Sequence, residues 1–370
     1  MQAVSAAGSS SGVVDMASGE IRIGVVGAGA IVRTRHLPGF KSQSGVRVVG
    51  VCNRRRETAA RVAREFDIPK VHGAWEDLLS DPEIDAILIG AWPYLHCPLT
   101  LAALDAGKHV LTQARMAMNA REAQRMLDRS RESPRLTAMV VPSPYGLTGD
   151  AFMRTLIASG YLGQLREVHV HSLNSQLADP AMPLSWRQMT RYSGFNMLTL
   201  GIVYETVSRW IAPAKRVLAT ASKIVARRFD PEQGEEVRVG TPDSVQVLTM
   251  HDDGSRGVYR LSGVVLHEPS MGVTLHGSEG TLVYDLLKDE IRGARRGEPD
   301  LHPMPIPDAD RGGWRVEADF VAAIRGERPV EHTTFAAGVR YMQFTEAVAR
   351  SARHQVPVML PLREFSNPSL

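Results

Sequence analysis

The stretch Ile21-Arg-Ile-Gly-Val-Val-Gly27-Ala-Gly29-Ala-Ile-Val32 joins a short apolar segment to two closely spaced glycines and a helix-like segment. Its first six residues have the mostly apolar pattern of a strand that is buried on both faces of a parallel sheet. The glycines allow a tight turn that brings backbone N–H groups against a pyrophosphate at the N-terminus of the following helix. Val32 stands in the third glycine position of the G-x-G-x-x-G pattern, so an ordinary glycine turn is the alternative. The expected cofactor contacts here are Gly27, Gly29, Ala30 and Ile31.

The composition is that of a globular protein with two domains. The 370 residues exceed the usual size of one hydrophobic core, and no run is apolar enough to cross a bilayer. The formal net charge of +3 is too small and too dispersed to favour nucleic acid. Cys52 and Cys97 lack metal-ligand spacing and suit a reducing compartment. We therefore expect a cytoplasmic protein that binds a small molecule and has no metal site, no nucleic-acid partner and no membrane association.

The second strand ends in a segment that bears on the choice of nucleotide. Residues 46–52 predict a strand and residues 57–66 a helix, which completes a βαβ unit. NAD-selective proteins place an acidic residue at the end of this strand, where this chain has Asn53 followed by Arg54 and Arg55. A guanidinium suits a ribose 2′-phosphate better than a hydroxyl, although arginines at a helix start can also be solvated. We expect NADP to be preferred over NAD.

Strands and helices continue to alternate, with a helix at 75–80, a strand at 84–90, a loop at 91–97, a helix at 98–106 and a strand at 109–112. This alternation predicts a doubly wound parallel sheet, whose ligands bind beyond the carboxyl ends of its strands. Position alone therefore marks a set of candidate site residues. They are Ala91, Trp92, Pro93, Tyr94, His96, Gln113 and Arg115. For His96, a structural hydrogen bond to nearby backbone is the equal alternative.

The second half of the chain predicts a different sheet. Strands are expected at 165–173 and 216–225, and hairpins at 244–250 with 257–264 and at 272–276 with 280–286. Strands joined by tight turns favour a mostly antiparallel sheet. Helices are expected at 150–159, 194–210, 314–325 and 334–351. The fold class is therefore α/β, with a disordered leader at 1–19, a Rossmann domain at 20–142 and a second α/β domain at 143–370.

Several segments together resemble the glucose-fructose oxidoreductase / inositol dehydrogenase / MocA (Gfo/Idh/MocA) family. Besides the glycine turn they are His36-Leu-Pro38, the loop from Pro93 to His96, Ala106-Gly-Lys-His-Val-Leu111, Trp186-Arg187, Gly201, Gly277-Ser-Glu-Gly-Thr-Leu282 and Phe320 to Pro329. The resemblance covers nearly the whole chain from residue 20. It implies a substrate cleft between the two domains at the nicotinamide of NAD(P), with Arg187 among the cofactor contacts. It also implies redox chemistry on sugars, polyols or related carbonyl compounds, and a homodimer or homotetramer formed through the open sheet.

The sequence departs from this family where its catalytic groups are expected. Family members carry Glu-Lys-Pro shortly after G-K-H-V-L, and the lysine assists proton transfer. This chain has Gln113-Ala114-Arg115 instead. An Asp and a His four residues apart normally project from one helix face, and alignment on Gly201 puts Thr199 and Val203 in those places. All three habitual acid–base groups are replaced.

Other side chains can take over these roles. Tyr192, Tyr94 and Tyr145 can each give a proton, and Asn196 can hydrogen-bond a substrate oxygen. Arg115 can stabilise a developing negative charge, but its pKa is too high for an acid. The alternatives are a packing role for Tyr145, a helix-capping role for Asn196, and a ligand carboxylate, a ligand phosphate or Glu122 as the partner of Arg115. The candidate catalytic set is Tyr192, Asn196, Arg115, Tyr94, Tyr145 and His96.

Three functions follow from this set. The first is a nicotinamide-dependent oxidoreductase with a non-standard proton donor. The second is an enzyme that uses bound cofactor for internal redox during elimination, isomerisation or glycoside cleavage. The third is a cofactor-binding sensor without turnover. A positioned acid or base contributes roughly 10²- to 10⁴-fold to a rate, so the loss of one group leaves catalysis possible and the loss of all requires substitutes.

Overall fold

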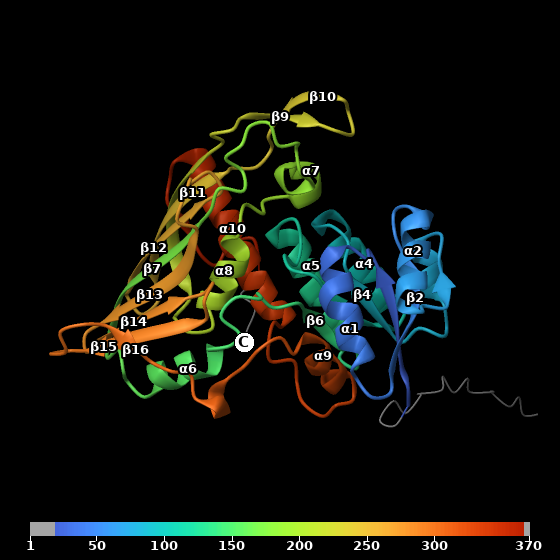
Figure 1. Cartoon of the computed structure of the whole chain (residues 1–370), viewed down its shortest axis with the longest axis horizontal. Coiled ribbons are helices and arrows are strands. Elements are labelled where there is room, and N and C mark those ends of the chain that lie inside the picture. Colours follow the sequence, from blue (N-terminus) through green and yellow to red (C-terminus); the bar gives the residue numbers. More distant parts are fainter. Residues whose placement is uncertain (1–18, 366–370) are drawn as a thin grey trace, which may run out of the picture.

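The computed structural model describes residues 19–365, so the expected disordered leader lies outside the described residues except for Gly19. Two sheets stand side by side, and the long helix α10 (Phe335–His354) lies between them (Figure 1). An isolated bridge between Met139 and Thr334 joins the end of the first sheet to the start of this helix. The two parts of the chain therefore meet along one helix.

The N-terminal sheet has six parallel strands in the order β3-β2-β1-β4-β5-β6, which confirms the doubly wound prediction. Every residue of β4 and β5 is buried, as expected for strands that are covered on both faces. The strands are β1 (Ile21–Val26), β2 (Val46–Cys52), β3 (Lys70–Val71), β4 (Ala86–Ile89), β5 (His109–Thr112) and β6 (Ala138–Val140).

Helices flank this sheet close to the expected positions, with one correction. The segment 91–97 is not a loop throughout, because helix α4 begins at Pro93, where a proline at the first helical position loses no hydrogen bond. Pro98 lies inside this helix. The helical elements of this part are the π-helical turn η1 (Val32–His36), α1 (Leu37–Lys41), α2 (Arg56–Phe66), α3 (Trp75–Ser80), α4 (Pro93–Asp105) and α5 (Ala120–Glu132).

The second sheet has nine strands in the order β16-β15-β14-β13-β7-β12-β11-β8-β17. Its neighbours pair antiparallel except β7 with β12, which confirms the mostly antiparallel prediction. A separate hairpin is formed by β9 (Arg227–Asp230) and β10 (Glu235–Arg238). The sheet strands are β7 (Leu165–Leu173), β8 (Ala214–Ser222), β11 (Ser244–His251), β12 (Arg256–Ser262), β13 (Ser270–Gly277), β14 (Gly280–Asp285), β15 (Glu290–Arg295), β16 (His302–Pro303) and β17 (Val358–Met359).

Helices α8 (Leu200–Val207) and α10 cover one face of this sheet (Figure 1). The ring of Tyr204 on α8 stacks on Phe344 of α10 with centroids 3.6 Å apart, and Tyr259 of β12 completes the cluster. Helix α6 (Asp150–Ala158) follows the Rossmann sheet in the chain. Helix α9 (Val316–Ile324) instead returns to the N-terminal core, where Phe320 packs with Leu37 and Phe40.

The helix expected over residues 194–210 is confirmed only over Leu200–Val207, and its first part is wrong. The chain forms a short 3-10 turn, η2 (Trp186–Gln188), then α7 (Thr190–Ser193), and starts α8 only at Leu200. Gly194 separates the two helices with a φ of +62°, and a Cβ there would come within 2.1 Å of the carbonyl oxygen of Met118. Asn196 therefore lies outside a helix, Thr199 takes the N-cap position of α8, and only Val203 lies within it.

Candidate active site

The strand ends of the Rossmann sheet line up at one edge. Val26 pairs with Cys52 on one side and with Ile89 on the other, and Ile89 pairs with Thr112. The residues that follow these four therefore emerge together. They are the glycine turn, Asn53, the segment that begins at Gly90, and Gln113. This edge is where doubly wound sheets bind their ligands.

The two glycines of the turn have different surroundings. Gly27 has a φ of +88°, and an added Cβ would lie 2.5 Å from the backbone nitrogen of Ala91, so the protein itself requires this glycine. Gly29 has no protein atom within 4 Å of the place where a Cβ would lie. Gly29, Ala30 and Ile31 are all exposed. The turn therefore leaves an open approach to the first N–H groups of the following helix, which fits a pyrophosphate.

Asn53 supports the turn through its side chain. Its Oδ1 accepts a hydrogen bond from the N–H of Ala28 at 2.7 Å, and its Nδ2 donates to Thr58 Oγ1 at 3.1 Å. Arg54 and Arg55 are exposed beside it. The guanidinium of Arg54 lies 5.8 Å from the ring centre of Trp92 and 3.1 Å from a carboxylate oxygen of Glu232 on the β9–β10 hairpin. Asn53 thus shapes the turn, while the arginines remain accessible to a ligand.

A buried polar network behind the turn was missed by sequence reasoning. His36 Nδ1 lies 2.5 Å from Glu317 Oε1, and His36 Nε2 is bonded to the side-chain amide of Gln113. Trp314 Nε1 donates to Glu317 Oε2 at 3.0 Å. The network ties Gln113, a predicted cofactor contact, to helix α9, which lies about 200 residues further along the chain. A close pairing of positions so far apart leaves no local signal in a sequence.

Three predicted site residues meet in one aromatic cluster at the junction of the two parts. Trp92 stacks on Trp186 with centroids 5.4 Å apart and an interplanar angle of 14°. The ring centroid of Tyr192 lies 4.9 Å from that of Trp92 and 5.2 Å from that of Tyr94. Arg187 lies over the ring of Trp186, with its guanidinium carbon 4.4 Å from the ring centre. The cluster joins the start of α4 to η2 and α7.

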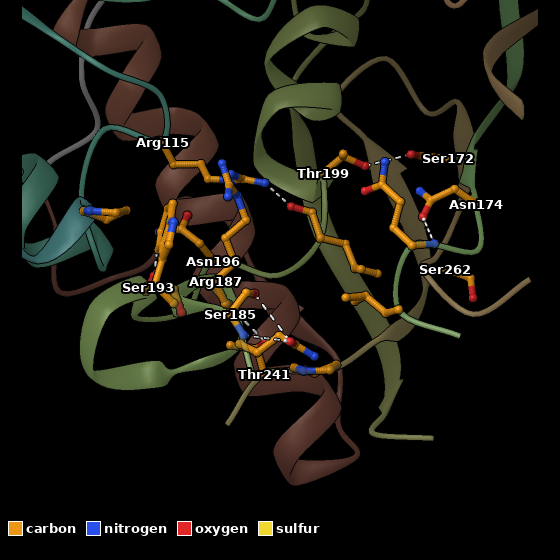
Figure 2. Close-up of a pocket in the computed structure, with 18 residues that line it drawn as sticks. Arg115, Ser172, Asn174, Ser185, Arg187, Ser193, Asn196, Thr199, Thr241 and Ser262 are labelled. Carbon is orange, nitrogen blue, oxygen red and sulfur yellow. Dashed lines mark hydrogen bonds between the residues drawn. The ribbon is translucent and has the colours of Figure 1, made fainter. Parts of the chain in front are cut away.

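A cavity of about 170 Å³ opens beside this cluster. Figure 2 shows Arg115, Arg187, Asn196 and Ser193 on one side of it and Ser172, Asn174 and Ser262 on the other. Within the described part of the chain, its lining residues include no Asp, Glu, His, Lys or Tyr. The remaining lining residues are Pro93, Gln176, Leu177, Ser185, Trp186, Gln188, Leu198, Thr199, Thr241, Pro242 and Gly263.

Arg115 is the link between the Rossmann edge and this cavity. It comes three residues after β5, and its guanidinium donates to the backbone carbonyl of Leu198 on the opposite side of the junction. Its Nε is buried without a hydrogen-bond partner. Burial, with a smaller effect from the charge of Arg187, lowers the pKa of Arg115 to about 10, while Tyr341 and Tyr145 act in the opposite direction. Arg115 therefore stays charged at neutral pH, with Tyr145 within electrostatic range.

Asn196 presents one free acceptor. The residue is 5% exposed, and its Nδ2 donates to the carbonyls of Ala117 at 2.8 Å and Ser193 at 2.7 Å. These bonds fix the amide, and Oδ1 is left buried without a partner. A buried acceptor without a partner is costly, so a ligand hydroxyl is favoured there.

His96 and Val203 lie away from the cavity, whereas Thr199 lines it. His96 is 1% exposed, and its two ring nitrogens each lie 2.9 Å from a backbone carbonyl oxygen, of Arg115 and of Ala91. Neither nitrogen is left for a substrate, which corrects the catalytic assignment of His96 in favour of the structural alternative. Val203 is fully buried in the core, and Thr199 lines the cavity with its hydroxyl bonded to Ser172 Oγ at 2.8 Å.

The far wall of the cavity was also missed from the sequence. Ser172 and Ser262 lie at the carboxyl ends of β7 and β12, the one parallel pair of the large sheet in the described residues. Because the two strands run the same way, these ends meet at the cavity. They are ordinary polar residues in the sequence, and only the strand pairing brings them together.

Two family models match the chain. The model described as an oxidoreductase family with an NAD-binding Rossmann fold matches residues 21–140, and the GFO/IDH/MocA C-terminal domain matches residues 151–283. The chain belongs to the Gfo/Idh/MocA oxidoreductase family. Membership confirms the resemblance stated from the sequence motifs, the two-part fold and the expectation of an oxidoreductase with an NAD-binding domain.

Individual members of the family resemble this chain over different lengths of its sequence. An uncharacterized oxidoreductase of Rhizobium meliloti, ORF334, is 31% identical over 149 residues, which are 40% of this chain and 44% of that protein. Levoglucosan dehydrogenase of Pseudarthrobacter phenanthrenivorans is 24% identical over 345 residues, covering 82% of this chain and 87% of that protein. The structure of levoglucosan dehydrogenase in complex with NADH and L-sorbose has a TM-score of 0.82 at 22% identity, over 92% of this chain and 99% of that one. The Gfo/Idh/MocA fold therefore extends through both sheets.

Among residues 19–365 no helix is long and apolar enough to span a membrane. The same residues hold no group of three or more His, Cys, Asp or Glu side chains placed to bind a metal ion.

Proposed function

We propose that this protein is an NAD(P)-dependent oxidoreductase that acts on a sugar, a polyol or a related carbonyl compound. The observation that carries the proposal is the position of Arg115, which follows a Rossmann strand and also lines the cavity. A substrate in the cavity would therefore lie beside the edge at which the glycine turn receives the dinucleotide. The bound cofactor supplies hydride transfer at its nicotinamide ring. Relatives of the family that are named levoglucosan dehydrogenase support this substrate class.

The side chains at the cavity can handle the charge of the reacting oxygen. The guanidinium of Arg115 stabilises negative charge on this oxygen, and Asn196 Oδ1 accepts a hydrogen bond from a substrate hydroxyl. The proton donor is one of the tyrosines near the junction. Tyr145 is the one whose charge couples to Arg115, whereas Tyr192 and Tyr94 lie in the aromatic cluster beside the cavity wall. Replacement of each tyrosine by phenylalanine, with kcat measured against pH, assigns the donor.

For the cofactor we propose NADP as the preferred form. Arg54 and Arg55 are exposed beside the glycine turn, and the ion pair of Arg54 with Glu232 lies on the surface. Exposed ion pairs contribute only about 0–1 kcal/mol, so this pair can give way to a 2′-phosphate. The double variant Arg54→Ala/Arg55→Ala should weaken NADPH binding at least ten-fold more than NADH binding. Arg61→Ala, an exposed position of helix α2, which begins directly after Arg55, is the control, and equal losses for both nucleotides would contradict the NADP proposal.

A second candidate is a cofactor-binding sensor without turnover. It is favoured by the cavity wall itself, which in the described chain has no carboxylate, histidine, lysine or tyrosine. The test is to mix the purified protein with NADPH or NADP⁺ and a panel of sugars, polyols and ketones, and to follow absorbance and product. Net change in the cofactor supports the oxidoreductase, and conversion without net change indicates internal redox. Tight binding with no conversion of any compound favours the sensor.

We further propose that the protein forms a homodimer or homotetramer through the large sheet, in the cytoplasm. The uncovered face of that sheet carries Leu218, Leu248 and Val258, which are 41%, 54% and 44% exposed. Leu248 pairs directly with the other two across β8, β11 and β12, so the three side chains form one apolar row. An apolar row on a broad flat sheet is a typical subunit contact.

A further inference from the structure

We propose that the cavity selects a substrate that carries a carboxylate next to hydroxyl groups, a sugar acid or a related polyhydroxy acid. This inference rests on the proposed function and names the substrate class of the same cavity. It is carried by two positive side chains without an acidic partner in the cavity wall and by one buried acceptor without a donor.

The charge of the cavity wall is one-sided. Arg115 and Arg187 both line the cavity, and its described lining residues include no Asp or Glu. Elsewhere in the molecule, some shielded arginines have a carboxylate partner, whereas the buried Arg228 is held by backbone carbonyls alone. Arg209 lies 2.6 Å from Glu205, and Arg22 lies 2.7 Å from Asp85. Arg115 is half-buried and has no acidic partner in the cavity wall, so it favours an anion, and the exposed Arg187 adds a second positive charge on the same side.

The two guanidinium groups are close enough to act together. Figure 2 places Arg115 and Arg187 on the same side of the cavity, and the charge of Arg187 is one of the causes that lower the pKa of Arg115. An anion bound between them relieves this repulsion. A carboxylate can accept two parallel N–H bonds from one guanidinium and still offer lone pairs to the other. Arg115 Nε, buried and without a partner, is one such donor.

The remaining groups require a ligand that also donates hydrogen bonds. Asn196 Oδ1 is an acceptor held in place by the two bonds of its Nδ2, so a carboxylate oxygen cannot satisfy it. A hydroxyl can. Across the cavity, Ser172, Asn174 and Ser262 offer further groups that both donate and accept. A hydroxy acid combines the anion that the arginines favour with the hydroxyls that this wall can bind.

The size of the cavity agrees with a small ligand. Its volume of about 170 Å³ is well above the ~10–15 Å³ that one water molecule needs by the same measure, so it has room for a small ligand.

The experiment compares matched acids and neutral compounds with the full-length protein and saturating NADP⁺ or NAD⁺. D-Gluconate and D-glucuronate are paired with D-glucitol and D-glucose, and both turnover and the shift of Tm are measured. We expect kcat/KM for the acids to exceed that for the neutral partners by at least ten-fold. Arg187→Gln should raise KM for the acids at least ten-fold more than KM for the neutral compounds, and Arg115→Gln should also lower kcat. Arg353→Gln, an exposed arginine at the end of α10, is the control.

The outcomes separate this inference from the proposed function. Equal turnover of acids and neutral sugars would overturn the inference and leave the oxidoreductase standing. Acids that raise Tm only when cofactor is present, without turnover, would support the inference and contradict the oxidoreductase. Arg187→Gln that weakens cofactor binding and leaves KM for the acids unchanged would assign Arg187 to the nucleotide and overturn the inference. Arg187 is exposed, so this variant should fold even if Arg115→Gln does not.

Discussion

At the scale of single residues, the glycine turn shows how one motif contains two different requirements. Gly27 is required by the protein, because its φ is +88° and a Cβ would press on Ala91. Gly29 faces open space and is required only if a ligand approaches it. The sequence motif marks both positions in the same way, and only the packing around them separates the two roles.

We expect Gly29→Ala to weaken cofactor binding at least ten-fold without lowering Tm, because the new methyl group meets no protein atom and lies in the path of the pyrophosphate. Gly313→Ala is the matched control, since its Cβ also meets nothing within 4 Å. Titration of NADPH fluorescence and thermal unfolding of each variant provide the measurement. Unchanged affinity of Gly29→Ala would place the dinucleotide elsewhere.

The buried network of His36 and Glu317 supports a second prediction. Glu317→Ala removes the acceptor of both His36 and Trp314, and we expect the free energy of unfolding to fall by about 2–4 kcal/mol. The NADPH affinity should fall as well, because His36 also holds Gln113. Urea unfolding of this variant is compared with that of the exposed Glu327→Ala. If Glu317→Ala loses no more unfolding free energy than Glu327→Ala, the network does not stabilise the fold.

At the scale of elements, the Rossmann strands were predicted well because their local signal is strong. The strands at 46–52 and 109–112 and the helix at 75–80 have the predicted bounds, and each combines an apolar or amphipathic pattern with a clear end signal. The helix expected over 194–210 was wrong in its first part because Gly194 ends α7 and Leu198 has a φ of +47°, so α8 begins only at Leu200. At Gly194 the close approach of Met118, from the other side of the junction, requires a glycine.

Strand β5 begins with a histidine that makes stability depend on pH. Burial lowers the pKa of His109 to about 4, and its Nδ1 accepts a hydrogen bond from the N–H of Thr137 at 2.8 Å. The folded state therefore holds the neutral ring, while the unfolded chain binds a proton below about pH 6.5. Stability must fall as the pH drops through this value, by about 2 kcal/mol between pH 7 and pH 5 from this group.

His109→Asn keeps an acceptor near Nδ1 and does not titrate. Its loss of unfolding free energy between pH 7 and pH 5 should be smaller than that of the unchanged protein by about this 2 kcal/mol. Chemical unfolding at both pH values measures the difference. Parallel pH curves for the two proteins would rule out His109 as the origin.

At the scale of the whole molecule, the large sheet has one covered face and one uncovered face. Leu248→Glu and Val258→Glu place charge in the apolar row of the uncovered face, and we expect each to lower the mass in solution to that of a monomer of 40.5 kDa. Leu266→Glu is the control, because Leu266 is 65% exposed and lies outside the row. Light scattering after size-exclusion chromatography measures the mass of the unchanged protein and of each variant. A monomer for the unchanged protein, or oligomers that survive both variants, would contradict assembly through this face.

The sequence by itself determined what local periodicity and short motifs can encode. Alternating apolar segments predicted both sheets, the glycine spacing marked the nucleotide edge, and the motifs identified the family that the models confirm. The residues that follow the Rossmann strands were predicted as site candidates because parallel strand ends always meet at one edge.

Only the tertiary structure decided which of these candidates reach a ligand. His96 is turned into backbone contacts, and Arg115 and Asn196 reach the cavity. The opposite wall comes from strand ends about 60 to 150 residues after Arg115. The physical reason is that site geometry depends on contacts between segments far apart in the chain, such as the parallel pairing of β7 with β12 and the return of α9 to the first sheet. A local pattern specifies the strand or helix, and the packing of these elements specifies which side chains face one another.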